Sequence, residues 1–325
     1  MLNLIGLGHA YPETVLDNDF LSSLPAALSA QEITAKTGIA QRCSSLSKEY
    51  ILETFNQKTK DAKSRAICTP TDLGVKAAEM ALENANLSWE DIGLIMGDGA
   101  TPVQTTPGES QRVGNASGLK IPAYDVFTPS AGFALTCQTL RNWKAERVPK
   151  YILSVSSHTP TQLVNYAQGH ERYYYGDAAS AVIFSLTEKG LFTVNDAHFT
   201  CDISQGMNIN FNTLGHATFN LDKLTKQIID KTVSLFVKCQ QANQADKPLV
   251  ILSALDLNSL KIAADKLEIS SDRLLEVVSL RGNALSATTG AVLSENAATI
   301  ESGQKILCAL AEGAVSFGYV LLTKN

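Results

Sequence analysis

Residues 123–135 read AYDVFTPSAGFAL, which predicts an apolar strand, a tight turn and a helix of small residues in close succession. The turn falls at Thr128 and Pro129, so Ser130 stands at the corner where the helix begins. A helix N-terminus carries unpaired N–H groups and the positive end of the dipole, which favour negative charge and suit a nucleophile. Serine is also a preferred N-cap residue, and from this stretch alone a cap is the simpler interpretation.

The composition indicates a globular protein with a large core. The chain has 325 residues, 45% hydrophobic and 18% charged, and a net charge of −5 with its lysines and arginines scattered. We therefore expect no nucleic-acid or membrane partner. No apolar run approaches the roughly 20 residues of a membrane span, and the N-terminus lacks the basic region of a cleavable signal, so we expect a cytoplasmic location.

The six cysteines are far apart and form no C-x-x-C pair, and no histidine stands at zinc-ligand spacing. We expect reduced, mostly buried thiols and no metal site.

Apolar strands alternate with amphipathic helices along the chain, which is typical of an α/β protein with largely buried sheets. The predicted helices cover residues 72–87, 221–239 and 258–267, and the predicted strands cover 91–100, 150–159 and 248–255.

An internal duplication relates the two halves of the sequence. The strand, turn and helix of AYDVFTPSAGFALTCQTL recur in LEVVSLRGNALSATTGAVL, residues 275–293. Likewise KYILSVSSHT followed by YYYGDAASAVIFS matches KILCALAEGAVSFGYVLL, residues 305–322. Two similar halves imply a pseudo-dyad, with a site where the turns converge.

Five motifs in order along the chain carry a resemblance to a known family. They are TGIAQR (37–42), GDGATP (97–102), PSAGF (129–133), YYYGDAASAV (173–182) and RGNALSATTG (281–290). Together they resemble β-ketoacyl-acyl-carrier-protein synthase III, in the thiolase superfamily. The resemblance implies an α/β thiolase-like fold of two fused halves in a layered αβαβα arrangement. The half 1–185 would carry the nucleophile corner, and the half 186–325 the asparagine turn and the oxyanion loop.

The resemblance also implies site residues, with departures from the family. The family's acylated cysteine corresponds to Ser130, its asparagine to Asn283 and its histidine to Ser253. In the segment that completes the oxyanion hole, only Gly313 stays at the matching place to donate its backbone N–H. Decarboxylative condensation draws on the family's histidine and asparagine, so that half-reaction looks impaired here.

Positions that contact the substrate in the family differ as well. The CoA-stacking tryptophan corresponds to Glu32 and a nearby arginine to Lys36, so adenine stacking is lost. The residue that floors the acyl pocket across the dimer interface corresponds to Thr106, and His158 stands where the family more often has an acidic residue.

A serine at this corner needs a general base. A thiol ionises near pKa ~8.5 and can be drawn down to ~3.5–7.5 at a helix N-terminus, whereas an alcohol holds its proton about as tightly as water, ~15.7. Ser130 can therefore be a nucleophile only if another group takes its proton. Of the five histidines, His216 aligns beside the family's pantetheine tunnel, and we place it ahead of His158 as the base.

Three functions remain open. The first is an acyltransferase of fatty-acid or polyketide-type biosynthesis that takes an acyl group from CoA or acyl-carrier protein onto Ser130. It would have no permanent cofactor, the CoA or phosphopantetheine thioester being its substrate. The second is a silent subunit that forms a heterodimer with an active ketosynthase. The third, which we rank lowest, is a condensing enzyme with an atypical base or a chain whose cysteine was replaced by design.

The resemblance further implies a homodimer or a heterodimer with a ketosynthase paralogue. We expect the dimer to form through the segment around Thr106 and the apolar strand 150–159.

Overall fold

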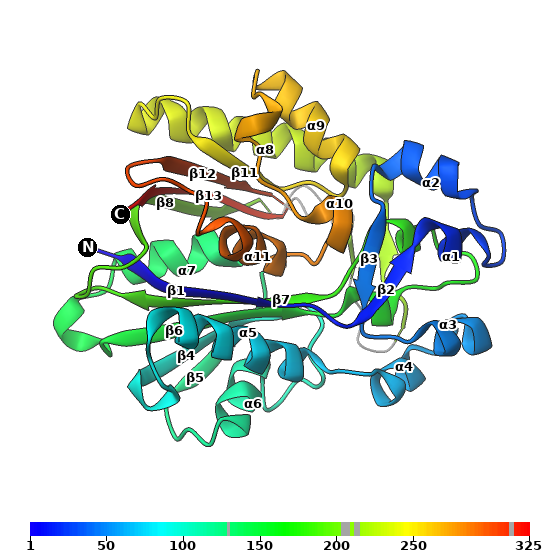
Figure 1. The fold of residues 1–325 in the computed structure, drawn as a ribbon, viewed down its shortest axis with the longest axis horizontal. Coiled ribbons are helices and arrows are strands. Elements are labelled where there is room, and N and C mark those ends of the chain that lie inside the picture. The colour runs from blue at the N-terminus through cyan, green and yellow to red at the C-terminus, as the bar shows by residue number, and fades with distance from the viewer. Residues whose placement is uncertain (129–130, 203–208, 211–214, 312–314) are drawn as a thin grey trace.

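The computed structural model describes residues 1–128, 131–202, 209–210, 215–311 and 315–325. Two stacked sheets, with helices between them and outside them, make up most of the fold (Figure 1).

The N-terminal half builds the first sheet. Its strands lie in the order β1 (Asn3–Ala10), β7 (Ala178–Ser185), β6 (Tyr151–His158), β4 (Ile92–Asp98) and β5 (Ala123–Val126). β7 runs antiparallel to both β1 and β6, whereas β6, β4 and β5 run parallel to one another. Parallel neighbours need crossover connections, which explains why helical segments alternate with these strands in the sequence.

The C-terminal half repeats this plan. Its strands lie in the order β8 (Phe192–Cys201), β13 (Ser316–Lys324), β12 (Lys305–Leu310) and β11 (Leu249–Leu252). Successive pairs are antiparallel, antiparallel and parallel, as they are from β1 through β4. A parallel bridge from Val250 to Leu274 takes the place of β5. The predicted pair of similar halves is thus confirmed.

The two sheets are joined along one short pairing. Asn3 and Leu4 of β1 pair antiparallel with Thr193 and Phe192 of β8, so that nine strands form one continuous hydrogen-bonded system. The predicted boundary at 185/186 falls in the connection between β7 and β8.

The helices form three layers around the two sheets (Figure 1). One pair lies between the sheets, with α7 against β8 and β13 and α11 against β1 and β7. A second pair covers the outer face of the first sheet, and a third covers the outer face of the second. These pairs are α7 (Gly132–Arg141) with α11 (Ala287–Asn296), α5 (Pro70–Ala85) with α6 (Glu109–Ala116), and α8 (Leu221–Asn243) with α9 (Leu257–Lys266). This is the predicted αβαβα layering.

Smaller elements flank one end of the sheets, where Figure 1 shows most of them in blue. β2 and β3 pair antiparallel, as do β9 and β10, and α10 packs against β3. The elements are β2 (Thr14–Asp17), α1 (Asn18–Ser22), α2 (Ala30–Thr37), β3 (Gln41–Ser44), α3 (Lys48–Thr54), α4 (Thr59–Arg65), β9 (Ile209–Asn210), β10 (Thr218–Phe219) and α10 (Val278–Arg281).

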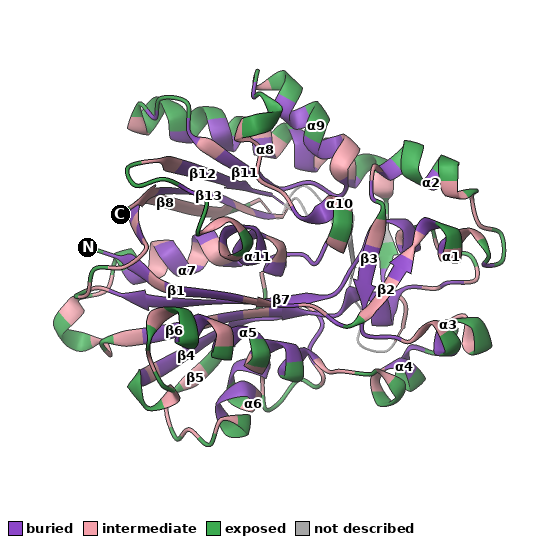
Figure 2. Cartoon of the chain, in the orientation of Figure 1, coloured by how far each residue is buried: buried purple, intermediate pink, exposed green. Residues whose placement is uncertain are grey.

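Burial follows the layers. All eight residues of β7, AASAVIFS, are buried, because α5 covers one face of this strand and α11 the other. Figure 2 shows buried residues along the strands and exposed residues on the outer faces of α8 and α9. No helix in the described part of the chain has the length and apolar character that crossing a membrane requires.

The strand that we expected at a dimer interface lies inside the sheet. β6 is hydrogen-bonded along both edges, to β4 and to β7, and therefore has no edge to offer a second chain. The predicted role of this strand in a dimer is wrong for that reason. Among the described strands, β5 is the one at the outer edge of the first sheet. Tyr124 within this strand is 38% exposed, and Phe127 directly after it is 62% exposed.

Two turns, one from each half, cross at close range. The N–H of Gly176 donates to the carbonyl of Asn283 (3.0 Å), and the N–H of Asn283 donates to the carbonyl of Tyr174 (2.9 Å). Gly282 has φ 74° and ψ 175°, a conformation almost confined to glycine. A Cβ at Gly282 would also lie 2.8 Å from the backbone nitrogen of Gly176. The YYYGDAAS and RGNALS motifs thus meet backbone to backbone.

We predict that Gly282→Ala lowers the free energy of unfolding by about 3 kcal/mol or more, because it adds steric overlap to backbone strain. Gly118→Ala is the matched control: φ is again 74°, but nothing lies within 4 Å of the added Cβ. We expect the control to cost about 1–2 kcal/mol. Urea unfolding of both variants measures the difference, and equal losses would show that the crossing is not a tight constraint.

Candidate active site

The corner residue Ser130 and the oxyanion residue Gly313 both lie outside the described residues, so their predicted roles stay predictions. The structure describes Thr128 and a fully buried Ala131 on either side of the corner. Helix α7 begins at Gly132, two residues after Ser130, and no side chain in the described chain caps its first turn. Its free N–H groups leave this end of the helix favourable for an anion.

Asn283 is buried, with 1% of its surface exposed, and its amide is held in one orientation. Its Nδ2 donates to the carbonyl of Ala254 (2.9 Å), and its Oδ1 accepts from the N–H of Leu285 (2.7 Å). Ala254 directly follows Ser253, the position of the family's histidine. The fold therefore brings these two predicted site positions together, although they are far apart in the sequence.

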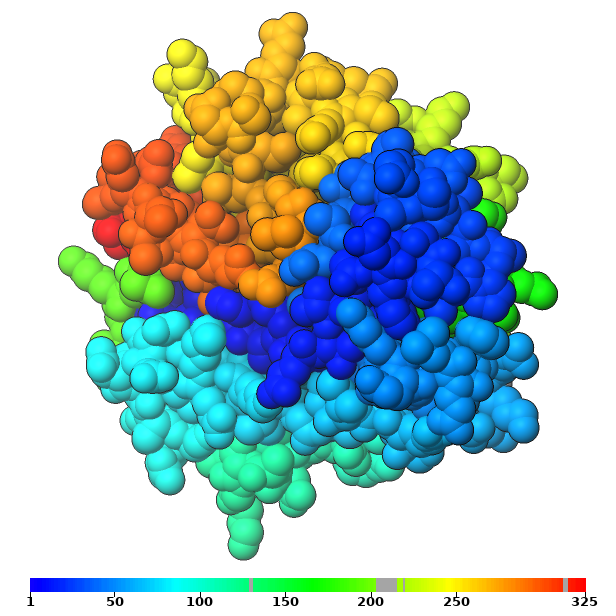
Figure 3. All heavy atoms as spheres, turned by 45° about the vertical axis from the view of Figure 1, so that its right-hand side comes forward, coloured from blue at the N-terminus to red at the C-terminus, as the bar shows by residue number. Residues whose placement is uncertain are grey.

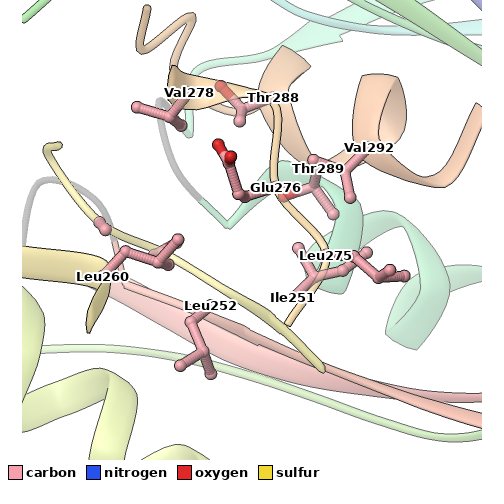
Figure 4. Close-up of a pocket in the computed structure, with 11 residues that line it drawn as sticks. Ile251, Leu252, Leu260, Leu275, Glu276, Val278, Thr288, Thr289 and Val292 are labelled. Atoms are coloured by element: carbon pink, nitrogen blue, oxygen red, sulfur yellow. The ribbon is translucent and has the colours of Figure 1, made fainter. Parts of the chain in front are cut away.

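Ser253 follows β11, and its N–H donates to the carbonyl of Ala309 (2.9 Å). Ser253 lines a cavity of about 20 Å³, which Figure 4 shows among Glu276, Thr288 and Thr289. A cavity of this size holds one water molecule. Glu276 is not a free base beside it, because its carboxylate accepts from the N–H and the hydroxyl of Ser279 (2.9 and 2.6 Å).

His158, at the end of β6, is completely buried, and its hydrogen bonds fix its tautomer. The N–H of Ala100 donates to Nδ1 (3.1 Å), so Nδ1 carries the lone pair and Nε2 carries the proton. Nε2 lies 2.7 Å from Oγ of Ser286 and therefore donates to it. Burial lowers the pKa of His158 to about 3. With its lone pair engaged, this imidazole cannot take a proton from a nucleophile.

His216 shows the opposite arrangement. Its Nε2 lies 2.7 Å from the carbonyl of Asn56, which can only accept, so Nε2 carries the proton and Nδ1 the lone pair. Nδ1 has no hydrogen-bond partner among the described residues. Asn56 is itself held by the carbonyls of Gln162 and Val164 (2.9 and 2.8 Å). His216 is therefore an imidazole oriented through Nε2, and its Nδ1 is unpartnered in the described part of the chain.

A groove of about 480 Å³ is lined mainly by residues of α8 and α9, and neither Asn283 nor Ser253 is among its lining residues. Tyr174, whose carbonyl binds the N–H of Asn283, lines it, and so does Lys36. Figure 3 shows the blue N-terminal segment packed against the yellow and orange C-terminal segments that form the other wall. The charged lining residues are Lys36, Lys226, Lys266, Asp222, Asp230 and Asp256. Opposite charges are balanced along the groove.

The other predicted contacts lie elsewhere. Glu32 caps α2, because its carboxylate accepts from the N–H and the hydroxyl of Ser29 (both 2.8 Å), and it does not line the groove. Thr106 is exposed on a loop, where its role in an acyl pocket stays a prediction. Within the described ranges, no three His, Cys, Asp or Glu side chains group closely enough to hold a metal ion.

Two functional contributors escaped the sequence analysis. The carbonyl of Asn56 orients His216, and no sequence pattern signals a backbone acceptor from a distant turn. Asp98 ends β4 and is 5% exposed. An acidic residue directly after the apolar run LIMG was a visible signal, because such a run predicts a buried strand.

We predict that His158 stays neutral, with its proton on Nε2, throughout the range of about pH 5–8. Long-range ¹H–¹⁵N NMR of the imidazole reports both the tautomer and the charge. A ring that titrates near its ordinary pKa of 6.5 would contradict the assigned hydrogen bonds.

The same shift predicts a pH dependence of stability. The folded pKa of about 3 lies below the unfolded value of 6.5, so the folded state binds fewer protons between these limits. The free energy of unfolding should therefore fall as pH falls from 6.5 towards 3, and His158→Gln should remove this contribution. Urea titrations at several pH values compare the two proteins. Parallel curves of unfolding free energy against pH would refute this contribution of His158.

Comparison with known proteins places these features in context. No family model matches the chain. It is 25% identical over 333 residues, 98% of each chain, to a β-ketoacyl-[acyl-carrier-protein] synthase III of Psychromonas ingrahamii. It is 24% identical over 332 residues, again 98% of each chain, to the protein of the same name from Rickettsia canadensis.

Solved structures share the fold. The crystal structure of 3-oxoacyl-[acyl-carrier-protein] synthase III from Aquifex aeolicus aligns with a TM-score of 0.84 at 21% identity, over 99% of this chain and 100% of that one. The tetronic acid condensing enzyme AbyA1 aligns with a TM-score of 0.84 at 15% identity, over the same shares.

Proposed function

We propose a function from one premise: the chain belongs to the β-ketoacyl-[acyl-carrier-protein] synthase III family of thiolase-like proteins. In this proposal it is an acyltransferase that moves an acyl group from a CoA or acyl-carrier-protein thioester onto Ser130. The acyl group then passes to an acceptor in fatty-acid or polyketide-type biosynthesis. The thioester is a substrate, and no bound cofactor takes part.

The orientation of His216 is the observation that carries the proposal. A serine nucleophile needs a base, and the two histidines that we considered differ in their available lone pairs. The lone pair of His158 is occupied by the N–H of Ala100, whereas Nε2 of His216 donates to Asn56 and its Nδ1 meets no partner among the described residues. His216 is therefore the better candidate for the base.

The proposed steps conserve atoms and charge. Oγ of Ser130 attacks the thioester carbonyl while its proton passes to Nδ1 of His216. The carbon–sulfur bond then breaks, and the imidazolium returns the proton to the departing thiolate. The acyl-serine ester is attacked by the acceptor in the same way, which regenerates the hydroxyl. The N–H of Gly313 and the amide of Asn283 are the groups that we expect to stabilise the oxyanion.

Condensation has less support than transfer. Ser253 brings no imidazole to the family's histidine position, and the cavity beside it has room for one water molecule. The enolate formed from a malonyl thioester would lack one of its two stabilising groups. Acyl transfer needs only a nucleophile, a base and an oxyanion site.

The groove lined by Tyr174 and Lys36 is the proposed entry for the thioester arm. Lys36 on its wall offers a cation to a phosphate group, in the place of the family's arginine. The balanced lysines and aspartates would add little long-range attraction for an anionic donor, so the arm itself would supply most of the affinity.

A silent subunit is the second candidate function, and the lack of an imidazole at Ser253 is the observation that favours it. Among the described strands β5 lies at the outer edge of the first sheet, and its exposed Tyr124 and neighbouring Phe127 suit pairing with a second chain, whether identical or paralogous. Sedimentation alone and with a ketosynthase paralogue would distinguish the homodimer from the heterodimer.

We predict that the wild type gains the mass of one acyl group when exposed to suitable acyl-CoA or acyl-carrier-protein thioesters. Ser130→Ala should gain none. His216→Ala should gain it about 10²–10⁴-fold more slowly, because a positioned base contributes that much. Intact-protein mass spectrometry over time measures all three, with His170→Ala as a control for loss of an exposed imidazole.

Two further variants separate the alternatives. Ser130→Cys should acylate faster than the wild type, since a thiol at a helix N-terminus is partly ionised near neutral pH. Malonyl condensation should stay weak in that variant unless Ser253→His is added. If broad screening leaves the wild type unmodified while Ser130→Ala supports a partner ketosynthase fully, the protein is a silent subunit.

A further inference from the structure

Asp98 is a buried acid that the proposed transfer reaction does not use. It is the last residue of β4, it is 5% exposed, and its Oδ2 has no hydrogen-bond partner within the described part of the chain. Such an atom costs free energy unless something satisfies it. Its surroundings therefore indicate what that partner is.

The carboxyl group of Asp98 touches the chain on both sides of residues 129–130. Its Oδ1 accepts from the N–H of Thr128 (3.3 Å). Its Oδ2 lies against Gly132, the first residue of α7, where an added Cβ would come within 1.8 Å of it. Gly132 is thus required for this approach, and one carboxyl group contacts both Thr128 and Gly132.

A cavity of about 20 Å³ lies behind the same carboxyl group, among α7, α11, β6 and β7. Four hydroxyl-bearing residues line it together with Asp98: Ser154, Ser156, Ser180 and Ser286. This volume suits one water molecule, and the lining offers it several polar partners.

A chain of hydrogen bonds runs from Ala100 through His158 to Ser286 beside the cavity, and each group donates to the next. The N–H of Ala100 donates to His158, and His158 donates through Nε2 to Ser286. Oγ of Ser286 lies 2.7 Å from Oγ of Ser156, on the cavity wall. Because the Ser286 hydroxyl already accepts from His158, its own proton is left to point toward Ser156 or toward the carboxyl group of Asp98.

We propose that Asp98 is a positioning residue: with one water molecule in the serine-lined cavity, it holds the start of α7 and sets the electrostatic potential there, two residues after Ser130 in the sequence. Its consequence for acyl transfer rests on the proposed function, but the placement of the carboxyl group does not.

The charge of Asp98 changes near neutral pH. Burial raises its pKa to about 7, although the hydroxyl of Ser286 and the Thr128 donors act in the other direction. The charge of Asp125 on β5 also raises its pKa, and His158 on β6 reaches the same cavity through its hydrogen bond to Ser286. The described residues of α7, α11 and β7 that line the cavity with it are Gly132, Phe133, Gly290, Ser180 and Val182, with Ser286 directly before α11, and none of these side chains is titratable. Ionised Asp98 opposes an anion at the start of α7, and protonated Asp98 does not.

The test uses a thiol as the probe at the turn. Ser130→Cys is prepared with and without Asp98→Asn, and alkylation by iodoacetamide is followed across pH by peptide-resolved mass spectrometry, which separates the six native cysteines. Above pH 7 we expect the Asp98→Asn protein to react about three- to tenfold faster, because no carboxylate raises the pKa of the thiol. Rates equal within about twofold would overturn the proposal.

Asp125→Asn in the same background is the matched control. Asp125 is a neighbouring carboxylate, but it binds the N–H and hydroxyl of Ser110 (3.0 and 2.8 Å) rather than the start of α7. We expect it to change the rate less than twofold. An effect as large as that of Asp98→Asn would mean that only general charge matters, which would also overturn the proposal.

A measurement on the otherwise unchanged protein covers the case in which Asp98→Asn does not fold. A ¹³C NMR titration of the aspartate carboxyls should show one group titrating near pH 7, and a high-resolution crystal structure should show a water molecule at Oδ2. An Asp98 carboxyl group that is already ionised at pH 5, or a cavity that holds no water molecule, would refute the proposal.

Failure of this inference and failure of the proposed function are distinguishable. Alkylation does not require acyl transfer, so a changed alkylation rate in a protein that is never acylated would refute the function and support the role of Asp98. Normal acylation with an alkylation rate that Asp98→Asn leaves unchanged would support the proposed function and refute the role of Asp98.

Discussion

The close crossing of two turns is the constraint on which the rest of the structure depends. Tyr174 and Gly176 from the first half exchange backbone hydrogen bonds with Asn283 from the second, and Gly282 makes room for this approach. Helices α7 and α11 between the sheets, one short strand pairing, and the packing of α10 on β3 and of α2 on α9 also join the two halves. Because the crossing involves backbone atoms, it fixes positions to within a hydrogen-bond length. The position of the Asn283 side chain is therefore fixed as closely as its backbone.

The candidate site follows from this crossing. Asn283 reaches the carbonyl of Ala254, which sets the place of Ser253 and of the groove that Tyr174 and Lys36 line. The proposed chemistry thus draws on segments from both halves. A shift at the crossing would change the amide, the small cavity and the entry groove together, which makes the glycine motifs matter for function as well as for folding.

Two histidines illustrate how neighbours assign roles to one residue type. A backbone N–H donates to His158, which fixes its lone pair, and full burial lowers its pKa. A backbone carbonyl accepts from Nε2 of His216, and its Nδ1 meets no partner among the described residues. The difference is only which backbone group each ring meets. Asp98 follows the same logic: its end-of-strand position is ordinary, but burial against Gly132 turns it into an acid that titrates near neutral pH.

The sequence by itself determined the alternation of strands and helices, the duplication, and the family to which the ordered motifs point. These are local patterns, because periodicity and turn residues act over a few neighbours. It also identified Asn283, Ser253 and both histidines as candidates. Only the tertiary structure decided that β6 is an inner strand, since strand order depends on pairing between distant segments. It likewise decided which histidine has its lone pair occupied by a backbone N–H and that Asp98 faces the start of α7. Burial and hydrogen-bond partners come from residues far apart in the chain, and no local pattern records them.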